Sequence, residues 1–319
     1  MKQKTHTLLF LCTLSLIYTF IISVHAEDNT AQTCNNTYLE PEIVSNFFDA
    51  HFGSHLEKLV GNNRLEIKSL HGLDDALDSL GNISPFDIEM GFSTANMYLW
   101  RGQKLGSDTS FQPFVSASPD FEPFGDLVFT FWTDITKDTP GKNDLEYDFV
   151  VEYTFHMLEL LKIIGCDESN CCYPLKKLLD FNLSTGYIYY WFPPATDDSH
   201  EIYWKLAYNL PFNPSFLISH DIDAGDGVWY EAGISQDFDL KLFVLSTFAT
   251  LGYNHRQWGK TSAFSIFQFG GSIPVSIGTH ITVEPFLSYS KRLKRTSTDD
   301  ETDLVHDELL GGFNFVIGF

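Results

Sequence analysis

The sequence predicts an all-β protein: a transmembrane antiparallel β-barrel of about 12 strands, preceded by a short helical N-terminal extension. Residues 311–319 alternate apolar with small or polar side chains and end on Phe319, which is typical of a strand with one apolar face. From Pro85 onward the chain divides into alternating stretches of about 9 to 14 residues, close to the roughly 9 to 11 that a tilted membrane strand needs. Aromatic residues make up 15% of the chain, and lipid-facing girdles use them heavily.

Residues 1–26 predict a signal peptide. Lys2 and Lys4 precede an apolar run from residue 8 to residue 24, and the run ends in small residues that a signal peptidase reads, with Ala26 last. An uncleaved transmembrane anchor is the alternative, because the run approaches the length that spans a bilayer. The acidic pair that follows, Glu27 and Asp28, favours cleavage.

Residues 27–85 predict a helical periplasmic extension. Apolar side chains recur at helical spacing from Ile43 to Leu59, directly after Pro41, and a second short helix is expected from Leu73 to Leu80. We expect the first helix to dock on the barrel rim, to enter the lumen, or to contact a periplasmic partner.

Residues 86–319 predict the barrel itself. An even number of strands returns the C-terminus to the side where the barrel began, which must be the periplasm. Long polar joints then fall outside and mostly tight ones inside, as expected for such barrels, except for the long joint 157–179. Ten strands is the alternative count, because two stretches are short. The twelve expected strands are 86–100, 110–118, 124–136, 144–156, 180–192, 201–210, 214–222, 227–236, 239–252, 262–273, 280–291 and 308–319.

The same alternation predicts the charges of the lumen. The polar parity of the first and fourth stretches is acidic and is opposed mainly by one arginine, which we expect at a strand end, in an ion pair or in a transverse field. Carboxylates along a narrow aqueous path enrich cations. The expected lumen charges are Asp87, Glu89, Arg101, Glu146, Asp148 and Glu152.

Four cysteines lie beyond the signal peptide, and we expect all of them on the periplasmic side, where disulfides form. We expect one local bridge from Cys166 to either Cys171 or Cys172, with the remaining cysteine joined to Cys34. A metal or redox site of the CxxC type is the alternative interpretation, but the spacing does not match that motif.

One loop crowds together the carboxylates of Asp221, Asp223 and Asp226, a spacing that could hold calcium. The glutamate that completes an EF-hand is not at the required offset, and a solvated turn is the other interpretation. We therefore predict no cofactor and no metal site, and these three aspartates are the candidates should a metal bind.

Two function classes are disfavoured by the sequence. A formal net charge of −22 repels the phosphates of nucleic acids. Catalysis finds little support, because no Gly-x-Ser-x-Gly elbow is present. The adjacent pairs Ser199-His200 and Ser219-His220 lie on expected strands or at their ends, and neighbouring side chains of a strand point to opposite faces. We expect no enzyme, with a barrel-embedded lipid hydrolase as the least favoured function.

Residues 93–103 (STANMYLWRGQ), followed by 110–113 (SFQP) and 131–132 (FW), resemble the opening of the TorF-like porin family of bacterial outer-membrane barrels. Residues 219–233 (SHDIDAGDGVWYEAG) are similar to the Asp-rich hairpin of that family. The resemblance covers roughly residues 86 to 319, and the N-terminal extension and the cysteine-rich insert depart from it. It implies an outer-membrane location and a barrel fold more firmly than an activity.

The function expected from these features is a porin-like outer-membrane barrel, a small pore that favours cations or is weakly selective. The alternative is an outer-membrane scaffold that holds a periplasmic partner through residues 27–85. The other expected partners are outer-membrane lipid and the barrel-assembly machinery, which would read the strand ending at Phe319.

Overall fold

The computed structural model describes residues 86–119, 125–139, 142–163, 178–193, 198–259, 262–294 and 305–319. The expected signal peptide, the helical extension 27–85 and the four cysteines Cys34, Cys166, Cys171 and Cys172 lie outside the described residues.

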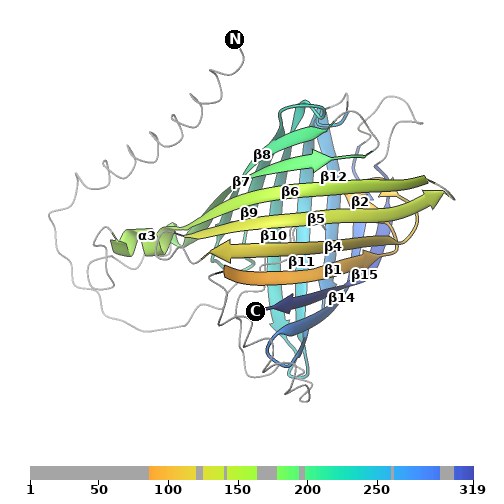
Figure 1. The fold of residues 1–319 in the computed structure, drawn as a ribbon. Helices are drawn as coiled ribbons and strands as arrows, with labels where there is room; N and C mark the ends of the chain where they lie inside the picture. Colours follow the sequence, from red (N-terminus) through yellow and green to blue (C-terminus); the bar gives the residue numbers. More distant parts are fainter. Residues whose placement is uncertain are drawn as a thin grey trace, which may run out of the picture. The chain divides into compact units, whose positions relative to one another are not determined.

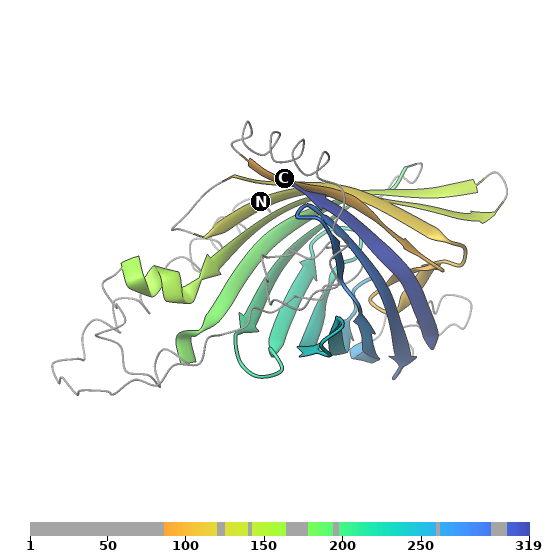
Figure 2. The ribbon, with the colours of Figure 1, turned by 90° about the horizontal axis from the view of Figure 1, so that it is seen from below.

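Twelve antiparallel strands form a closed barrel, which confirms the predicted fold class (Figures 1 and 2). Each strand pairs with the next along the chain, and the pairings of β12 with β14 and of β15 with β1 leave no free edge. The strands are β1 (Phe86–Ala95), β4 (Ser110–Pro119), β5 (Asp126–Thr139), β6 (Lys142–His156), β7 (Phe181–Trp191), β8 (Ser199–Tyr208), β9 (Ser215–Asp221), β10 (Gly227–Asp239), β11 (Val244–His255), β12 (Ser262–Ser272), β14 (Ile281–Arg292) and β15 (Glu308–Gly318).

Three further elements accompany the barrel strands. The short strand β13 (Val275–Ile277) follows β12 and also pairs with β14. Strands β2 (Tyr98–Trp100) and β3 (Gln103–Gly106) form a separate hairpin. Helix α3 (Met157–Ile163) directly follows β6, at the barrel end where the C-terminus lies and opposite the end that carries β2 (Figures 1 and 2). We call these the terminal end and the hairpin end. Within the described residues, no helix has both the length and the apolar character needed to cross a membrane.

The two-residue period of the strands separates an apolar outer face from a polar inner one. On β6, Phe149 is 46% exposed on the outside, whereas its neighbour Asp148 is 2% exposed. The same contrast recurs around the barrel because side chains of a strand point alternately to the two faces. Large apolar side chains exposed on the outside include Phe111, Phe129, Val151, Phe216, Ile234, Phe264, Phe269, Leu287 and Phe313.

The first and last strands close the barrel along a tight seam. Phe319 exchanges two backbone hydrogen bonds with Ile88, at 2.8 and 2.9 Å. Two glycines permit the close approach of the strands: a Cβ added at Gly91 would overlap the carbonyl oxygen of Phe315, and one at Gly312 would overlap that of Thr94. The C-terminal residue is therefore part of the pairing that completes the barrel.

The expectation of one strand over 86–100 is wrong, because β1 leaves the sheet after Ala95. At this point Asn96 bonds to β15 through its side chain as well as its backbone. Its amide Nδ2 donates to the carbonyl of Leu309 at 2.9 Å, and its Oδ1 accepts from the backbone N–H of Gly311 at 3.0 Å. These bonds are the last contacts of this segment with β15. After Asn96 the chain leaves the barrel wall and continues into the hairpin β2–β3.

Candidate functional site: a hairpin folded into the lumen

Residues 98–106 form a β-hairpin that is not part of the barrel wall. Trp100 pairs with Gln103, and the two residues between them, Arg101 and Gly102, have φ angles of 48° and 75°. Positive φ at both central residues is the geometry of a type I′ turn, which fits the twist of a hairpin. Glycine is needed at the second position, because a Cβ there would overlap the side chain of Ile266 on β12.

One side of the hairpin contacts β5, β6 and β7. The Tyr98 hydroxyl donates to Oε2 of Glu146 at 2.8 Å, and the Tyr98 ring lies 6.0 Å from the ring of Trp132. The Trp100 ring meets Tyr190 edge-on at 6.4 Å. The side chains of Tyr98 and Trp100 are 4% and 7% exposed, so the hairpin is packed against the wall and is not a solvated loop.

The rest of the hairpin reaches the remaining wall. Gly102 lies against Ile266 of β12, and Gln103 forms an isolated backbone bridge with Val305. Lys104 forms an ion pair with Glu308 of β15, with 3.1 Å between Nζ and Oε1. Contacts on so many strands mean that the hairpin crosses the lumen and narrows it at this level.

Arg101, at the tip of the hairpin, forms a buried ion pair with the opposite wall. Its Nη1 and Nη2 each donate to one carboxylate oxygen of Glu201 on β8 at 2.8 Å, and Nη1 also donates to Oε1 of Gln257 at 2.7 Å. The guanidinium carbon lies 4.5 Å from the ring centre of Trp100 and 5.7 Å from that of Trp229 on β10. Arg101 is 5% exposed and Glu201 0%. We call Arg101, Glu201 and Gln257 the latch.

The residues expected in the lumen separate into two groups. The first group is Arg101, Glu146 and Asp148, which lie at or beside the hairpin. Glu152, farther along β6, accepts a hydrogen bond from the Tyr203 hydroxyl at 2.5 Å. Asp87 and Glu89 lie near the terminal end of β1, away from the hairpin.

Sequence reasoning missed several buried charges that share the inner face. Applying the two-residue alternation to every expected strand would have identified these charged residues as inward-facing. Gln257 lies in a loop, where no such alternation exists. The missed charged residues are Asp134, Lys205, Glu201, Glu231 and Glu284.

The hairpin tyrosine stays protonated in this setting. Burial, with the nearby carboxylates of Glu146, Asp148 and Asp134, raises the pKa of Tyr98 well above its ordinary value. Because each of these influences disfavours the phenolate, the Tyr98 hydroxyl retains the proton that it donates to Glu146.

The three loop aspartates have different environments. Asp221 is buried, and its carboxylate accepts hydrogen bonds from the Ser199 hydroxyl at 2.8 and 2.9 Å and from the backbone N–H groups of Asp223 and Gly225 at 3.1 and 3.0 Å. Asp223 is 59% exposed and lies 3.8 Å from Nε2 of His200. Asp226 adopts a positive φ of 36° in the turn. Asp221 thus organises the turn, and the described residues contain no group of three or more His, Cys, Asp or Glu placed to hold a metal ion.

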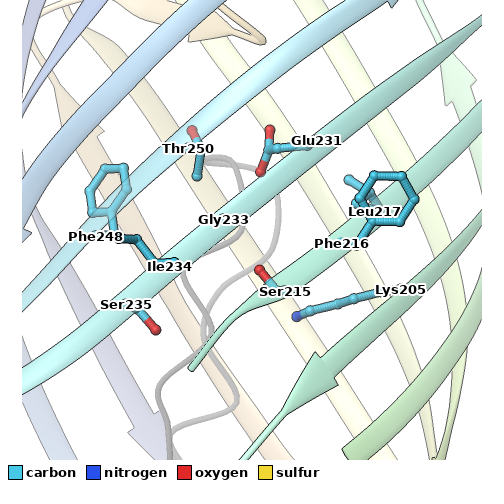
Figure 3. Close-up of a pocket in the computed structure, with 10 residues that line it drawn as sticks. All are labelled: Lys205, Ser215, Phe216, Leu217, Glu231, Gly233, Ile234, Ser235, Phe248 and Thr250. Atoms are coloured by element: carbon cyan, nitrogen blue, oxygen red, sulfur yellow. The ribbon is translucent and has the colours of Figure 1, made fainter. Parts of the chain in front are cut away.

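A small cavity lies in the wall between β8, β9, β10 and β11, lined in part by Lys205 and Glu231 (Figure 3). Its volume of about 20 Å³ is the space of about one water molecule. The cavity is therefore too small for a solute, and the hairpin with its latch is the better candidate for the functional site.

Comparisons with known proteins add little. No family model matches this sequence, and no curated protein matches it. Among solved structures, the chain is similar to the translocator domain of the autotransporter NalP from Neisseria meningitidis, with 11% sequence identity, a TM-score of 0.35, and coverage of 78% of this chain and 93% of that one. The barrel described above rests on its own strand pairing and not on this similarity.

Proposed function

We propose that this protein is a bacterial outer-membrane pore that favours small cations and is narrowed at the hairpin end by residues 98–106. The observation that carries the proposal is the imbalance of buried charge on the inner face. Among the described residues, the buried ionisable side chains of Asp, Glu, Lys and Arg comprise seven carboxylates, which are Asp134, Glu146, Asp148, Glu201, Asp221, Glu231 and Glu284, and two cations, which are Arg101 and Lys205.

The membrane location is supported by the outer face of the barrel. A closed barrel satisfies every backbone hydrogen bond between its own strands, which is what the interior of a bilayer requires. The outward side chains are predominantly apolar and often aromatic, as a lipid-facing surface requires. The inner face is polar, which suits a water-filled path.

The preference for cations follows from the same inner face. A water-filled path between low-dielectric walls of one charge sign concentrates ions of the opposite sign. Of the two buried basic side chains, Arg101 is already paired with Glu201. A permeating ion would therefore lie in the field of an inner wall on which carboxylates outnumber basic groups.

The pore is tested by planar-bilayer conductance under a salt gradient, with the full mature chain and a form lacking residues 27–85. We expect a reversal potential of the sign that reports cation preference. A reversal potential of the opposite sign would contradict the charge argument. Silence from both forms would contradict the pore and favour a scaffold acting through residues 27–85, whereas current only from the shortened form would mean that the extension plugs the pore.

The membrane location is tested by an arginine placed on the outer face. Phe149 is at the middle of β6, so Phe149→Arg should destabilise the barrel by about 2–4 kcal/mol if this level meets the bilayer centre. Phe238 is similarly exposed, at 45% against 46%, but lies one residue from the end of β10, so Phe238→Arg should cost about 0–1 kcal/mol. Urea unfolding in lipid vesicles measures both, and equal losses would contradict this placement.

A further inference from the structure

We propose that Glu201, Gln257 and Trp229 form a binding site for a guanidinium group, which Arg101 occupies in this structure and which a small arginine-like solute can occupy in its place. The site is part of the lumen wall, whereas its present occupant belongs to the hairpin. Binding itself does not depend on the pore proposed above. Only the consequence, that an arginine-like solute passes or blocks this barrel, rests on that function.

The wall groups are held in place independently of Arg101. Nε2 of Gln257 donates to Oε2 of Glu201 at 2.7 Å, so the two acceptors of the guanidinium are joined to each other. The backbone of Gln257 is held as well, because the side-chain amide of Asn254 donates to its carbonyl at 2.9 Å. Trp229 is 0% exposed on β10 and cannot turn away easily. A site whose groups are already positioned loses little entropy when a ligand binds.

The shape of the site favours a guanidinium over other cations. Glu201 accepts two parallel N–H bonds, an arrangement that matches the planar fork of a guanidinium and not the single point charge of an ammonium. Gln257 adds an amide acceptor, and the face of Trp229 lies close enough for a cation–π contact. Ligands with a free guanidinium, such as arginine, are therefore the chemical class that fits.

The site also requires a cation when Arg101 is absent. Glu201 is fully buried, and a buried carboxylate without a partner is strongly unfavourable. The site lies close to the hairpin end, since Glu201 is the third residue of β8 and Gln257 is in the loop that follows β11. A solute that enters the hairpin end thus reaches the site without crossing the whole lumen.

In the unaltered protein the hairpin competes with any free solute. A short chain segment holds its tip at an effective concentration on the order of millimolar, so arginine in solution should bind at least about tenfold more weakly than to a protein that lacks the Arg101 side chain. The variant Arg101→Ala, made in the full mature chain, is therefore the form in which binding is measured.

Isothermal titration calorimetry of folded Arg101→Ala protein in detergent, with folding checked by heat-modifiable gel migration, tests the proposal. L-arginine should bind saturably, at least about tenfold more tightly than L-lysine, which lacks the planar fork. L-citrulline, its uncharged isostere, should not bind. Arg101→Gln provides a second form should Arg101→Ala fail to fold. The matched control is Lys291→Ala, which removes a cation from an exposed ion pair with Asp307 and should gain no arginine binding.

Three results would overturn the site: equal binding of arginine and lysine, arginine binding that survives Glu201→Gln in the Arg101→Ala background, or no arginine binding at all. A fall in bilayer current of Arg101→Ala on addition of arginine would link the site to the pore. If calorimetry detects binding but no current is ever observed, the guanidinium site stands and the proposed pore is wrong.

Discussion

Replacing Glu201 with glutamine is expected to shift the equilibrium between the docked and the released hairpin by roughly 100-fold or more toward release, and so to widen the conducting path of the barrel. Glutamine can accept one hydrogen bond from Arg101, but it leaves the buried guanidinium without a countercharge. Removing one partner of a buried ion pair typically costs about 3–5 kcal/mol. Because the loss applies only while the hairpin occupies the lumen, it shifts the equilibrium toward hairpin positions in which Arg101 reaches water.

Single-channel recording in planar bilayers measures this effect. Arg101→Gln should act in the same direction, since it leaves the buried Glu201 without a countercharge. The control is Lys104→Ala, which removes the ion pair between the hairpin and Glu308. That pair is partly exposed, at 28% and 15%, and such pairs contribute about 0–1 kcal/mol. Folded Glu201→Gln protein with the conductance of the unaltered chain would show that the latch does not hold the hairpin.

Replacing Gly91 with valine should prevent the barrel from closing. A Cβ at this position of β1 would overlap the backbone carbonyl of Phe315 on β15, and a backbone atom cannot move aside as a flexible side chain does. The strands must then separate at the seam, which exposes two edges and removes the hydrogen bonds between Ile88 and Phe319. We expect a loss above about 3 kcal/mol, at the upper end of what overpacking costs, and a missing heat-modifiable band on gels.

Gly311→Ala is the matched control for the seam. Its added Cβ would lie 3.2 Å from a terminal methyl group of Leu287 and 3.8 Å from the carbonyl of Phe286, so a small side-chain movement accommodates it. We expect its midpoint of urea unfolding to stay close to that of the unaltered protein. A Gly91→Val protein that still shows the heat-modifiable band would contradict the close approach at the seam.

The wall of the barrel follows from patterns that a sequence displays locally. Side chains of a strand alternate between two faces, so Asp148 and Phe149 could be assigned to opposite faces from their neighbours alone. The ends of most strands were also predictable to within a few residues, because turns are rich in Gly, Pro, Asn and Asp.

The hairpin could not be predicted from the same local patterns. Residues 98–100 continue the alternation of β1, so no local signal shows that the chain has left the sheet after Ala95. That departure depends on Asn96, which bonds to β15 more than 200 positions away in the sequence, with separations of 213 and 215 residues. A period of two describes a strand equally well in a wall or in a hairpin.

The sequence by itself thus determined an all-β barrel, the faces of its strands and an acidic inner surface, because these depend on spacing between near neighbours. Only the tertiary structure decided what Arg101 does. Its partners Glu201 and Gln257 are 100 and 156 residues away, and they meet only when the closed barrel brings β8 and the loop after β11 opposite the hairpin tip. The physical reason is that a buried charge pairs with whichever group the folded chain places within hydrogen-bonding distance. The spacing of residues along the sequence does not show which group that is.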